Sequence, residues 1–486
     1  MPEIKLEHIT KRWGKFYAVE DLNLTIADNS FVTLLGPSGC GKTTTLRMIA
    51  GLETPTSGRI TIGDQVVFDS AMGINVPANK RRVGFLFQNY ALWPNMTVYE
   101  NISFGLTNVK EDLPKIDFDT RVNARLAEIL SAPGEVTKVL AECRDKKGKL
   151  DDKKALLKLI DTFTISQFTA KKLLGYHLED GKDVSAEAAA LREKAEAARK
   201  ALEATGGSYD ADYAIYKDGQ PVTEVRKLTK EEIDLTVRRV ARIVKIGMFM
   251  DRYPAELSGG QQQRGAIART LAPSPKVLFM DEPLSNLDAK LRQEMRTELK
   301  RLHSDTNSTF VYVTHDQLEA MTLSTKVCLM DTGVLQQYAP PLEIYGHPAN
   351  LFVAEFVGNP TMNFIPATVK AADGNRASLS LLGHDATFTA KAPLGELTGS
   401  AVLGVRPEFL PIVQGGPLRG KTYSTLPAGM ETTVKLSCGG TMLTSVVFGC
   451  VDYAVDTELP LNIVGDNIAL FDQASGQSVG FGSVTF

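Results

Sequence analysis

Short apolar runs separated by turn residues open the chain. They cover Ile4–Ile9, Leu22–Ile26 and Phe31–Leu35, and each has the length of a strand. A glycine-rich stretch follows and leads into a helical pattern that begins at Lys42 and ends at Gly51. This pattern predicts strands, a loop and then a helix, as at the start of an α/β domain.

Similar apolar runs return late in the chain, at Val277–Met280, Phe310–Val313 and Val327–Met330. Each is followed by a turn or helix signal, which is the alternation of a mostly parallel sheet. We therefore expect these runs and the first 107 or so residues to form one α/β domain.

The stretch at about 110–228 has a different character, because Lys, Glu and Ala dominate it. Glu196 and Lys200 are spaced to pair on one face of a helix. The pattern predicts a mostly helical and solvent-exposed segment that interrupts the α/β domain.

Beyond Pro340-Pro341 and a helical Leu351–Val357, the pattern becomes one of short alternating strands with glycines between them. The clearest of these runs are Ala377–Leu382, Val402–Val405, Thr432–Leu436 and Thr444–Phe448. They predict a second, all-β domain, either a small barrel or a sandwich.

Composition narrows the class of protein. The chain has 486 residues, 43% of them hydrophobic and 23% charged, as in folded globular proteins of two to four domains. A net charge of -3 argues against a chain built mainly to neutralise nucleic-acid phosphates, and we expect no nucleic-acid partner, although the charge is compatible with a local basic patch. Five cysteines without CxxC spacing favour a reducing compartment without disulfides or zinc. No signal peptide or run of about 18 apolar residues is present, so we expect a cytoplasmic protein that reaches a membrane only through a partner.

The first chemical motif is Gly36-Pro37-Ser38-Gly39-Cys40-Gly41-Lys42-Thr43, which matches GxxxxGK[ST] between a strand and a helix. In this motif backbone N–H groups cradle phosphates, and the helix N-terminus adds its positive end. Lys42 is expected to reach the β- and γ-phosphates, and Thr43 to place its hydroxyl on Mg²⁺. The alternative is a glycine-rich turn that matches by coincidence.

The second motif is a run of four apolar residues, Val277–Met280, that ends in Asp281 and Glu282. A buried strand would deliver both acids at its carboxyl end. Asp281 suits Mg²⁺, and Glu282 suits a general base that holds the attacking water. The alternative is a strand that ends in a solvated acidic turn.

The third motif, Leu257-Ser258-Gly259-Gly260-Gln261, precedes an amphipathic helix and offers a second anion-binding geometry. Alone it would be a common helix cap. Together the three motifs resemble those of the ABC ATPases, and the resemblance covers the chain except the 110–228 stretch. It implies an α/β P-loop nucleotide-binding domain with a helical subdomain.

The resemblance assigns further roles. It implies that Gln88 is the Q-loop residue, Ser285-Asn286-Leu287-Asp288 the D-loop and His315 the switch histidine at the γ-phosphate. An ordinary loop histidine and an ordinary aromatic remain the alternatives for His315 and for Trp13, which stands where the family stacks on adenine. Catalysis is assigned to Glu282, His315, Gln88 and Lys42, and Mg²⁺ to Thr43, Gln88 and Asp281. The ATP contacts are Trp13, Gly36, Pro37, Ser38, Gly39, Cys40, Gly41, Lys42, Thr43, Thr44, Arg252, Ser258, Gly259, Gly260, Gln261 and Asp288.

In this family two nucleotide-binding domains pack head to tail, with ATP between the P-loop of one and the signature of the other. The chain holds one of each, so the resemblance implies a second copy or a paralogue. ATP would favour the closed dimer, and its hydrolysis would remove that preference.

Two further segments narrow the choice among the ABC ATPases. Gly358-Asn359-Pro360-Thr361-Met362-Asn363-Phe364 and Gly404-Val405-Arg406-Pro407-Glu408 resemble the C-terminal OB-like domain of the maltose, multiple-sugar and glycerol-phosphate importer ATPases. The partners implied are two membrane permease subunits and, indirectly, an extracellular sugar-binding protein. The chain would then sit on the cytoplasmic face of the membrane, and the OB-like domain would either receive a regulator or only extend the dimer contact.

Alternatives remain at this stage. Importers of sulfate, polyamines or iron carry related C-terminal domains, and soluble ABC ATPases of translation or DNA repair form another class. An ATPase that binds nucleotide without hydrolysis is disfavoured because every catalytic position is filled. We expect a nucleotide-binding domain at 1–340, a linker at 341–357 and an OB-like regulatory domain at 358–486. The 110–228 insertion is a tolerated surface excursion, a docking or regulatory arm, or disordered.

Overall fold

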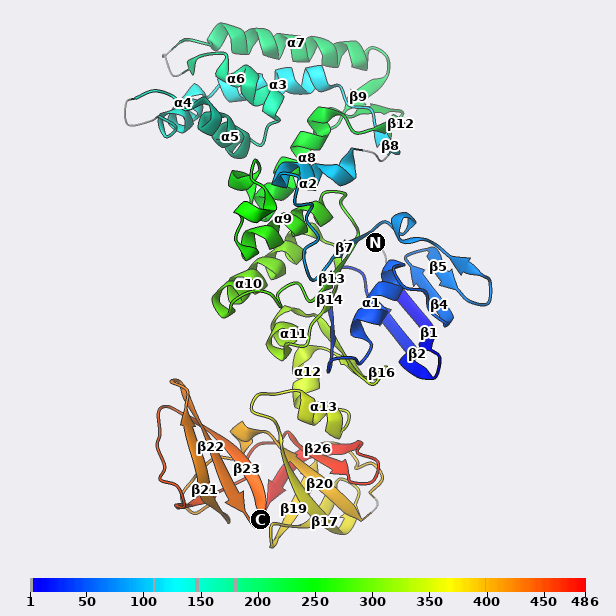
Figure 1. Ribbon diagram of the computed structural model, residues 1–486, viewed down its shortest axis with the longest axis vertical. Coiled ribbons are helices and arrows are strands. Elements are labelled where there is room, and N and C mark those ends of the chain that lie inside the picture. The colour runs from blue at the N-terminus through cyan, green and yellow to red at the C-terminus, as the bar shows by residue number, and fades with distance from the viewer. Residues whose placement is uncertain (1–2, 108–109, 145–147, 179–181, 398) are drawn as a thin grey trace. The chain divides into compact units, whose positions relative to one another are not determined.

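The computed structural model describes residues 3–107, 110–144, 148–178, 182–397 and 399–486 (Figure 1). Its contacts divide the chain into two compact units. Unit one comprises residues 1–83, 279–282 and 307–486, and unit two comprises residues 84–278 and 283–306.

Unit one begins with an antiparallel sheet in the order β2-β1-β4-β5-β6. Its strands are β1 (Ile4–Trp13), β2 (Phe16–Ile26), β4 (Ser57–Ile62), β5 (Gln65–Asp69) and β6 (Ile74–Asn75). A turn of 3₁₀ helix, η1 (Ala78–Lys80), follows.

The second sheet of unit one has the order β16-β15-β3-β14-β13. β3 runs parallel to both β14 and β15, and every residue of β3, β13 and β14 is buried. This explains their nearly continuous apolar sequence, because a parallel sheet is covered on both faces. The predicted strands are confirmed as β3 (Phe31–Leu35), β13 (Val277–Asp281), β14 (Thr309–Val313) and β15 (Lys326–Asp331), with β16 (Val334–Ala339) at the edge.

Two helices follow strands of this sheet. α1 (Lys42–Ala50) has the predicted bounds and ends at Gly51, which adopts the left-handed conformation of a helix C-cap (φ 79°). α11 (Gln317–Leu323) follows β14, and the side chain of Asp316 caps its first turn by accepting from Leu318 N and Glu319 N.

The C-terminal part of unit one is all β, as predicted, after α12 (Pro341–Gly346) and α13 (Leu351–Phe356). Six strands close a barrel: β17 (Asn363–Asp373), β18 (Arg376–Leu381), β19 (His384–Ala390), β20 (Ser400–Val405), β25 (Ile468–Asp472) and β26 (Ser478–Thr485). A second sheet contains β21 (Leu418–Pro427), β22 (Glu431–Cys438), β23 (Thr441–Phe448) and β24 (Glu458–Leu461), and η6 (Pro407–Phe409) precedes it. Barrel and sheet share one apolar core.

Unit two consists mainly of helices, with a few short strands. Its helices in the ABC-like part of the sequence are α2 (Val98–Ser103), η2 (Phe104–Leu106), α8 (Lys230–Ile243), η4 (Gly247–Phe249), η5 (Pro254–Glu256), α9 (Gly259–Leu271) and α10 (Ala289–Thr306). β7 (Val83–Leu86) lies beside β13 in the sheet order. α8 begins with a capping box of Thr229 and Glu232, in which both backbone N–H groups are satisfied.

The inserted segment leaves and rejoins unit two through a two-stranded stalk. β8 (Lys110–Pro114) pairs antiparallel with β12 (Thr223–Lys227), and Pro114 lies opposite Thr223. Between the two strands lie α3 (Phe118–Leu130), α4 (Pro133–Ala141), α5 (Asp152–Phe163), α6 (Gln167–Leu174), α7 (Ser185–Glu203), β9 (Gly207–Tyr209), β10 (Ile215–Lys217) and β11 (Gln220–Pro221) (Figure 1).

The prediction that this segment is solvent-exposed is correct for α7, in which Ala188 is the buried residue, and for the strands β11 and β12. The other helices enclose an apolar core of their own, with Leu126, Leu140, Leu159 and Leu173 almost fully buried. The sequence suggested exposure because charged residues are frequent, but they lie on the outer faces of amphipathic helices. Residues 145–147 and 179–181 of the predicted helical stretch are outside the described residues.

Helix α8 holds the inserted helices by their ends. Near the start of α6, Glu231 accepts from Ser166 Oγ at 2.9 Å and Asp234 accepts from Gln167 N at 2.6 Å. At the end of α5, Arg242 donates to the carbonyl oxygens of Ile160 and Asp161. Carboxylates thus meet a helix N-terminus and a guanidinium meets a C-terminus, which is the favourable arrangement for both helix dipoles.

Candidate functional site

The loop between β3 and α1 has two positions, Gly36 and Gly41, at which the backbone accommodates only glycine. Gly36 and Gly41 have φ angles of 149° and 98°. A Cβ atom at Gly36 would lie 2.2 Å from Met330 O, and one at Gly41 would lie 2.3 Å from Ala18 O. The loop therefore curls back tightly to the N-terminus of α1, where free N–H groups and the helix dipole attract anions.

Lys42 is the first residue of α1 and is 5% exposed. Its Nζ donates to the carbonyl oxygens of Gly36 at 2.8 Å and Pro37 at 2.7 Å. These contacts hold a positive charge inside the curl of the loop. Cys40 is buried beside it, and desolvation raises the pKa of the thiol. The remaining predicted loop positions, Ser38, Gly39, Thr43 and Thr44, lie on the same loop and first turn.

Thr43 and Asp281 come together across unit one. Thr43 Oγ1 donates to Asp281 Oδ1 at 2.9 Å, and Arg47 Nη2 lies 3.6 Å from Asp281 Oδ2. Burial raises the pKa of Asp281, and the contacts with Thr43 and Arg47 offset this only in part. A hydroxyl and a desolvated carboxylate in contact are oxygen donors of the kind that Mg²⁺ prefers, so the residues present fit that ion.

Glu282 and His315 meet at the carboxyl ends of neighbouring strands. Glu282 follows β13 with a φ of 43°, a left-handed conformation that is uncommon for a residue with a side chain. Its N–H donates to Val313 O at 3.1 Å, and its Oε1 lies 3.2 Å from His315 Nδ1. The sharp turn after β13 thus places the Glu282 carboxylate against the imidazole.

Trp13 lies at the end of β1 and is 49% exposed. The Phe16 ring is nearly parallel to it, with 6.4 Å between centroids and 5° between planes. Lys11 Nζ lies 5.4 Å from the centroid of the indole ring and is paired with Glu53 at 2.6 Å. Phe16 was not among the predicted residues, although its place directly after the Gly14-Lys15 turn from Trp13 was a usable signal.

In unit two, the predicted signature opens α9. Ser258 is its N-cap residue, and Ser258 N donates to Gln261 Oε1 at 3.0 Å. A Cβ atom at Gly260 would lie 2.8 Å from the Leu291 side chain, so this glycine allows α9 to approach α10 closely. Arg252 lies six residues before Ser258, and its carbonyl oxygen accepts from Val98 N at 2.9 Å.

The predicted Q-loop and D-loop residues also belong to unit two. Gln88 follows β7, and its carbonyl oxygen accepts from Asn286 Nδ2 at 3.1 Å. Asp288 Oδ1 accepts from Leu291 N at 2.9 Å and so caps the start of α10. Two groups of predicted residues result. Unit one brings together Lys42, Thr43, Asp281, Glu282 and His315, and unit two links Gln88 with the D-loop and holds the signature.

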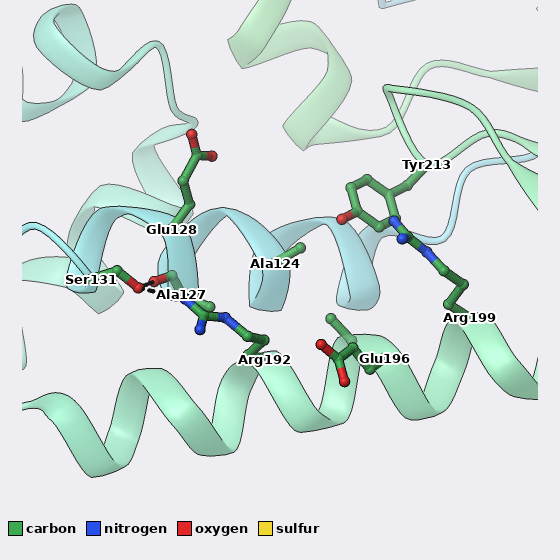
Figure 2. A pocket seen from close by; sticks show the side chains of 9 residues that line it. Ala124, Ala127, Glu128, Ser131, Arg192, Glu196, Arg199 and Tyr213 are labelled. Atoms are coloured by element: carbon green, nitrogen blue, oxygen red, sulfur yellow. Dashed lines mark hydrogen bonds between the residues drawn. The ribbon is translucent and has the colours of Figure 1, made fainter.

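A surface crevice of about 370 Å³, which none of these residues lines, lies between α3 and α7 (Figure 2). Ala124 and Ala127 line it from α3, and Arg192, Glu196 and Arg199 rise from α7. Arg192 donates to Ser131 Oγ at 2.8 Å. The charged side chains are exposed and of both signs, so the crevice selects no particular ligand. No helix in the described ranges combines the length and apolar character needed to cross a bilayer.

Comparison with known protein families gives two matches. Residues 19–285 match the model described as "ABC transporter", and residues 358–410 match the model described as "MalK OB fold domain". The first match alone spans more than half of the chain.

Individual relatives match over almost the whole length. A trehalose/maltose import ATP-binding protein of Thermococcus litoralis is 33% identical over 492 residues, which cover 99% of this chain and 100% of the relative. An sn-glycerol-3-phosphate import ATP-binding protein of Ruegeria pomeroyi is 31% identical and covers 99% of both chains. A maltose/maltodextrin import ATP-binding protein of Salmonella typhimurium is 33% identical over 90% of this chain and 86% of its own.

Proposed function

Because the chain belongs to the ABC transporter family of ATPases, we propose that it is the ATP-hydrolysing subunit of a sugar importer. The observation that carries this proposal is the presence, in one chain, of the ABC transporter match and the MalK OB fold match. Two relatives named for the import of trehalose, maltose or maltodextrin, each 33% identical, support it, and the 31% identical relative is named for the import of sn-glycerol-3-phosphate. A related importer of polyamines, sulfate or iron is the alternative.

ATP would bind at the curl between β3 and α1. The backbone N–H groups of the loop and the Lys42 ammonium would hold the phosphates, and the half-exposed Trp13 ring would stack on the base. Lys42 would exchange its bonds to the loop carbonyls for bonds to phosphate oxygens. Thr43, Asp281 and Gln88 would hold Mg²⁺, which neutralises charge on the phosphates.

Glu282 would accept the proton of the attacking water. Its contact with His315 Nδ1 supports this role, because it fixes both the carboxylate and the imidazole. The other imidazole nitrogen would then face the γ-phosphate. The protein contributes mainly position and charge, as in other phosphoryl transfers.

A complete site would need a second chain. The signature residues Ser258, Gly259, Gly260 and Gln261 would complete the ATP site of a head-to-tail partner, and Arg252 and Asp288 would lie at the same interface. The N-terminus of α9, where Gly260 packs closely against Leu291, supports this. It is a helix N-terminus that can attract an anion, in addition to that of α1, and the chain has one P-loop. The second chain would be another copy or a paralogue, closed by ATP and released by hydrolysis.

Two membrane permease subunits would bind beside Gln88. Support comes from three large apolar side chains in the sequence around it that remain exposed: Phe87, Trp93 and Phe104. The rings of Trp93 and Phe104 lie 6.0 Å apart and form one apolar patch. The chain would sit on the cytoplasmic face of the membrane, and an extracellular sugar-binding protein would deliver the sugar to the permease.

The domain organisation that we propose is a nucleotide-binding domain at 1–340, a linker at 341–357 and an OB-like regulatory domain at 358–486. The 110–228 insertion interrupts the first domain. Its own core and its narrow stalk support a separately folding excursion that leaves nucleotide chemistry to the rest of the domain.

Affinity purification from gently solubilised native membranes tests the importer assignment. We expect one or more permease pairs to copurify with the tagged chain, and mass spectrometry will identify them together with any sugar-binding protein. The Glu282→Gln variant serves as a matched bait that should hold the dimer closed. Recovery of ribosomes or DNA-repair proteins without any membrane protein would refute the assignment.

A further inference from the structure

The side chain of Gln317 connects the loop of His315 to the segment that enters the C-terminal barrel. Gln317 is the first residue of α11, two residues after His315. Its Nε2 donates to Phe356 O, and its Oε1 accepts from Gly358 N at 2.9 Å. One half-buried amide therefore holds the backbone on both sides of Val357, which lies between the end of α13 at Phe356 and the first barrel strand, which begins at Asn363.

The barrel holds the same segment from its other side. Arg406, which is 2% exposed, donates to the carbonyl oxygens of Val357 and Ala354 and to Tyr345 O at 2.8 Å. Burial lowers the pKa of Arg406, so the guanidinium depends on these carbonyls to compensate its desolvation. The backbone at 354–358 is thus fixed between the barrel and α11.

The turn between Gln317 and His315 is itself held by hydrogen bonds. Asp316 N donates to Thr314 Oγ1 at 3.0 Å, and Asp316 Oδ1 accepts from Leu318 N at 2.8 Å. Thr314 Oγ1 also bonds to the buried Glu319 carboxylate at 2.7 Å. Because these hydrogen bonds make the turn rigid, a displacement of Gln317 also displaces His315.

We propose that Gln317 is a positioning residue for His315. The barrel fixes the position of the 354–358 segment, this segment fixes Gln317, and Gln317 in turn sets the position of His315 relative to Glu282. The inference rests on the proposed role of His315 at the γ-phosphate. Its physical basis is that groups at a reacting phosphate must be held within about 0.5 Å of their productive place. A shift of about 1 Å can reduce a rate by roughly 100-fold.

Gln337 provides a matched control. It lies on β16, and its amide makes the same pair of bonds to the neighbouring segment: Nε2 donates to His347 O at 3.0 Å, and Oε1 accepts from Ala349 N at 2.9 Å. Both glutamines are half-buried. Loss of either amide removes two hydrogen bonds to the stretch between α12 and the barrel, but only Gln317 adjoins the His315 turn.

The experiment compares Gln317→Leu and Gln337→Leu in the purified full-length chain, with kcat, KM, the Kd for ATP and the unfolding temperature as readouts. We expect kcat of Gln317→Leu to fall about 5- to 30-fold while its Kd for ATP stays within about twofold. Gln337→Leu should keep kcat within about twofold despite a similar change in unfolding temperature. Gln317→Glu, which can still accept from Gly358 N but cannot donate to Phe356 O, should give an intermediate kcat and covers the case in which the leucine variant does not fold.

Equal kcat values for the two leucine variants would overturn the positioning role, and so would a Kd for ATP that rises as much as kcat falls. The wild-type chain and Glu282→Gln separate this outcome from a failure of the proposed function. If the wild type hydrolyses ATP and Glu282→Gln does not, a normal Gln317→Leu removes only the present inference. If Glu282→Gln hydrolyses ATP at the wild-type rate, the catalytic assignment itself is wrong.

Discussion

At the scale of single residues, the candidate site contains two side chains that the backbone presents in unusual settings. Glu282 adopts a left-handed conformation directly after a buried strand, and Lys42 lies buried against carbonyl oxygens of its own loop. Each setting has a cost in folding free energy, which a purely structural role would not require. Each also leads to a distinct prediction about nucleotide chemistry.

Replacement of Glu282 by Gln keeps the size of the side chain and removes its ability to take a proton. We expect turnover to fall by at least about 100-fold, since a general base contributes roughly 10²–10⁴-fold. ATP binding should persist and a stable dimer should accumulate, which size-exclusion chromatography with ATP will detect. The exposed Glu256→Gln is the control, and normal turnover in Glu282→Gln would remove Glu282 as the base.

Replacement of Lys42 by Ala removes the buried charge from the proposed phosphate cradle. A charge-assisted hydrogen bond contributes about 1.5–3 kcal/mol, so we expect ATP affinity to fall roughly 10- to 100-fold. Equilibrium binding of a fluorescent ATP analogue measures this. The exposed Lys80→Ala should bind normally, and an unaltered affinity in Lys42→Ala would show that the phosphate cradle is wrongly placed.

At the scale of elements, a partly buried ion pair joins the root of the inserted segment to α8. Arg226 on β12 donates to Glu232 on α8 at 2.6 and 2.8 Å, and Thr229 N donates to the same carboxylate. Burial alone would raise the pKa of Glu232, but the bonds from Arg226 and Thr229 outweigh it and the pKa is lowered. The folded state therefore favours the charged carboxylate more than the unfolded state does.

The lowered pKa of Glu232 leads to a prediction about how the stability of the protein depends on pH. The stabilisation is fully present above the ordinary glutamate pKa of 4.5 and disappears as the pH falls through the lowered pKa of the folded protein. We expect Glu232→Gln to lose about 1.5–3 kcal/mol at pH 7 and to approach the wild type well below pH 4.5. Thermal unfolding across this range measures the effect. Glu224→Gln, which removes an exposed partner of Arg226, should cost less than about 1 kcal/mol at any pH.

The elements also show which features a sequence can reveal. Strand and helix bounds at Phe31–Leu35 and Lys42–Ala50 were predictable, because a buried strand and a P-loop helix have local signatures. The candidate site residues on those elements follow from the same local motifs and remain predictions. The core of the insertion and the bonds of Gln317 were not predictable, because they join residues far apart in the sequence. The core of the insertion was missed because the prediction relied on the frequency of charged residues and did not consider the helical periodicity of each segment.

At the scale of the whole molecule, the stalk of the insertion allows a clean excision. Pro114 and Thr223 are the last paired residues of β8 and β12, so residues 115–222 can be replaced by a two-residue Asn-Gly turn. We expect ATP turnover to stay within about twofold, and uptake through the native permease to be unchanged, because the insertion has its own core. Steady-state ATPase and transport assays on the same variant measure both.

The two assays separate the alternatives for the insertion. Normal turnover with lost uptake would assign it to a docking or regulatory arm. Loss of both activities would show instead that α8 needs the contacts of Glu231, Asp234 and Arg242 to hold its place. The variant Glu231→Ala with Asp234→Ala, which keeps the insertion but removes two of these contacts, distinguishes an unsupported α8 from a missing partner surface.

The pairing of β3 with β14 has a consequence for synthesis on the ribosome. β3 is made early, but its parallel neighbours β14 and β15 begin at Thr309 and Lys326. At about 5–20 residues per second the nascent P-loop therefore waits roughly a quarter of a minute to a minute for the strands beside it. The inserted helices have a core of their own, and α8, which holds their ends, is complete by Ile243, so they can fold in that interval. An interrupted chain would carry a folded insertion next to an unsupported P-loop, and it could survive proteolysis without ever binding nucleotide.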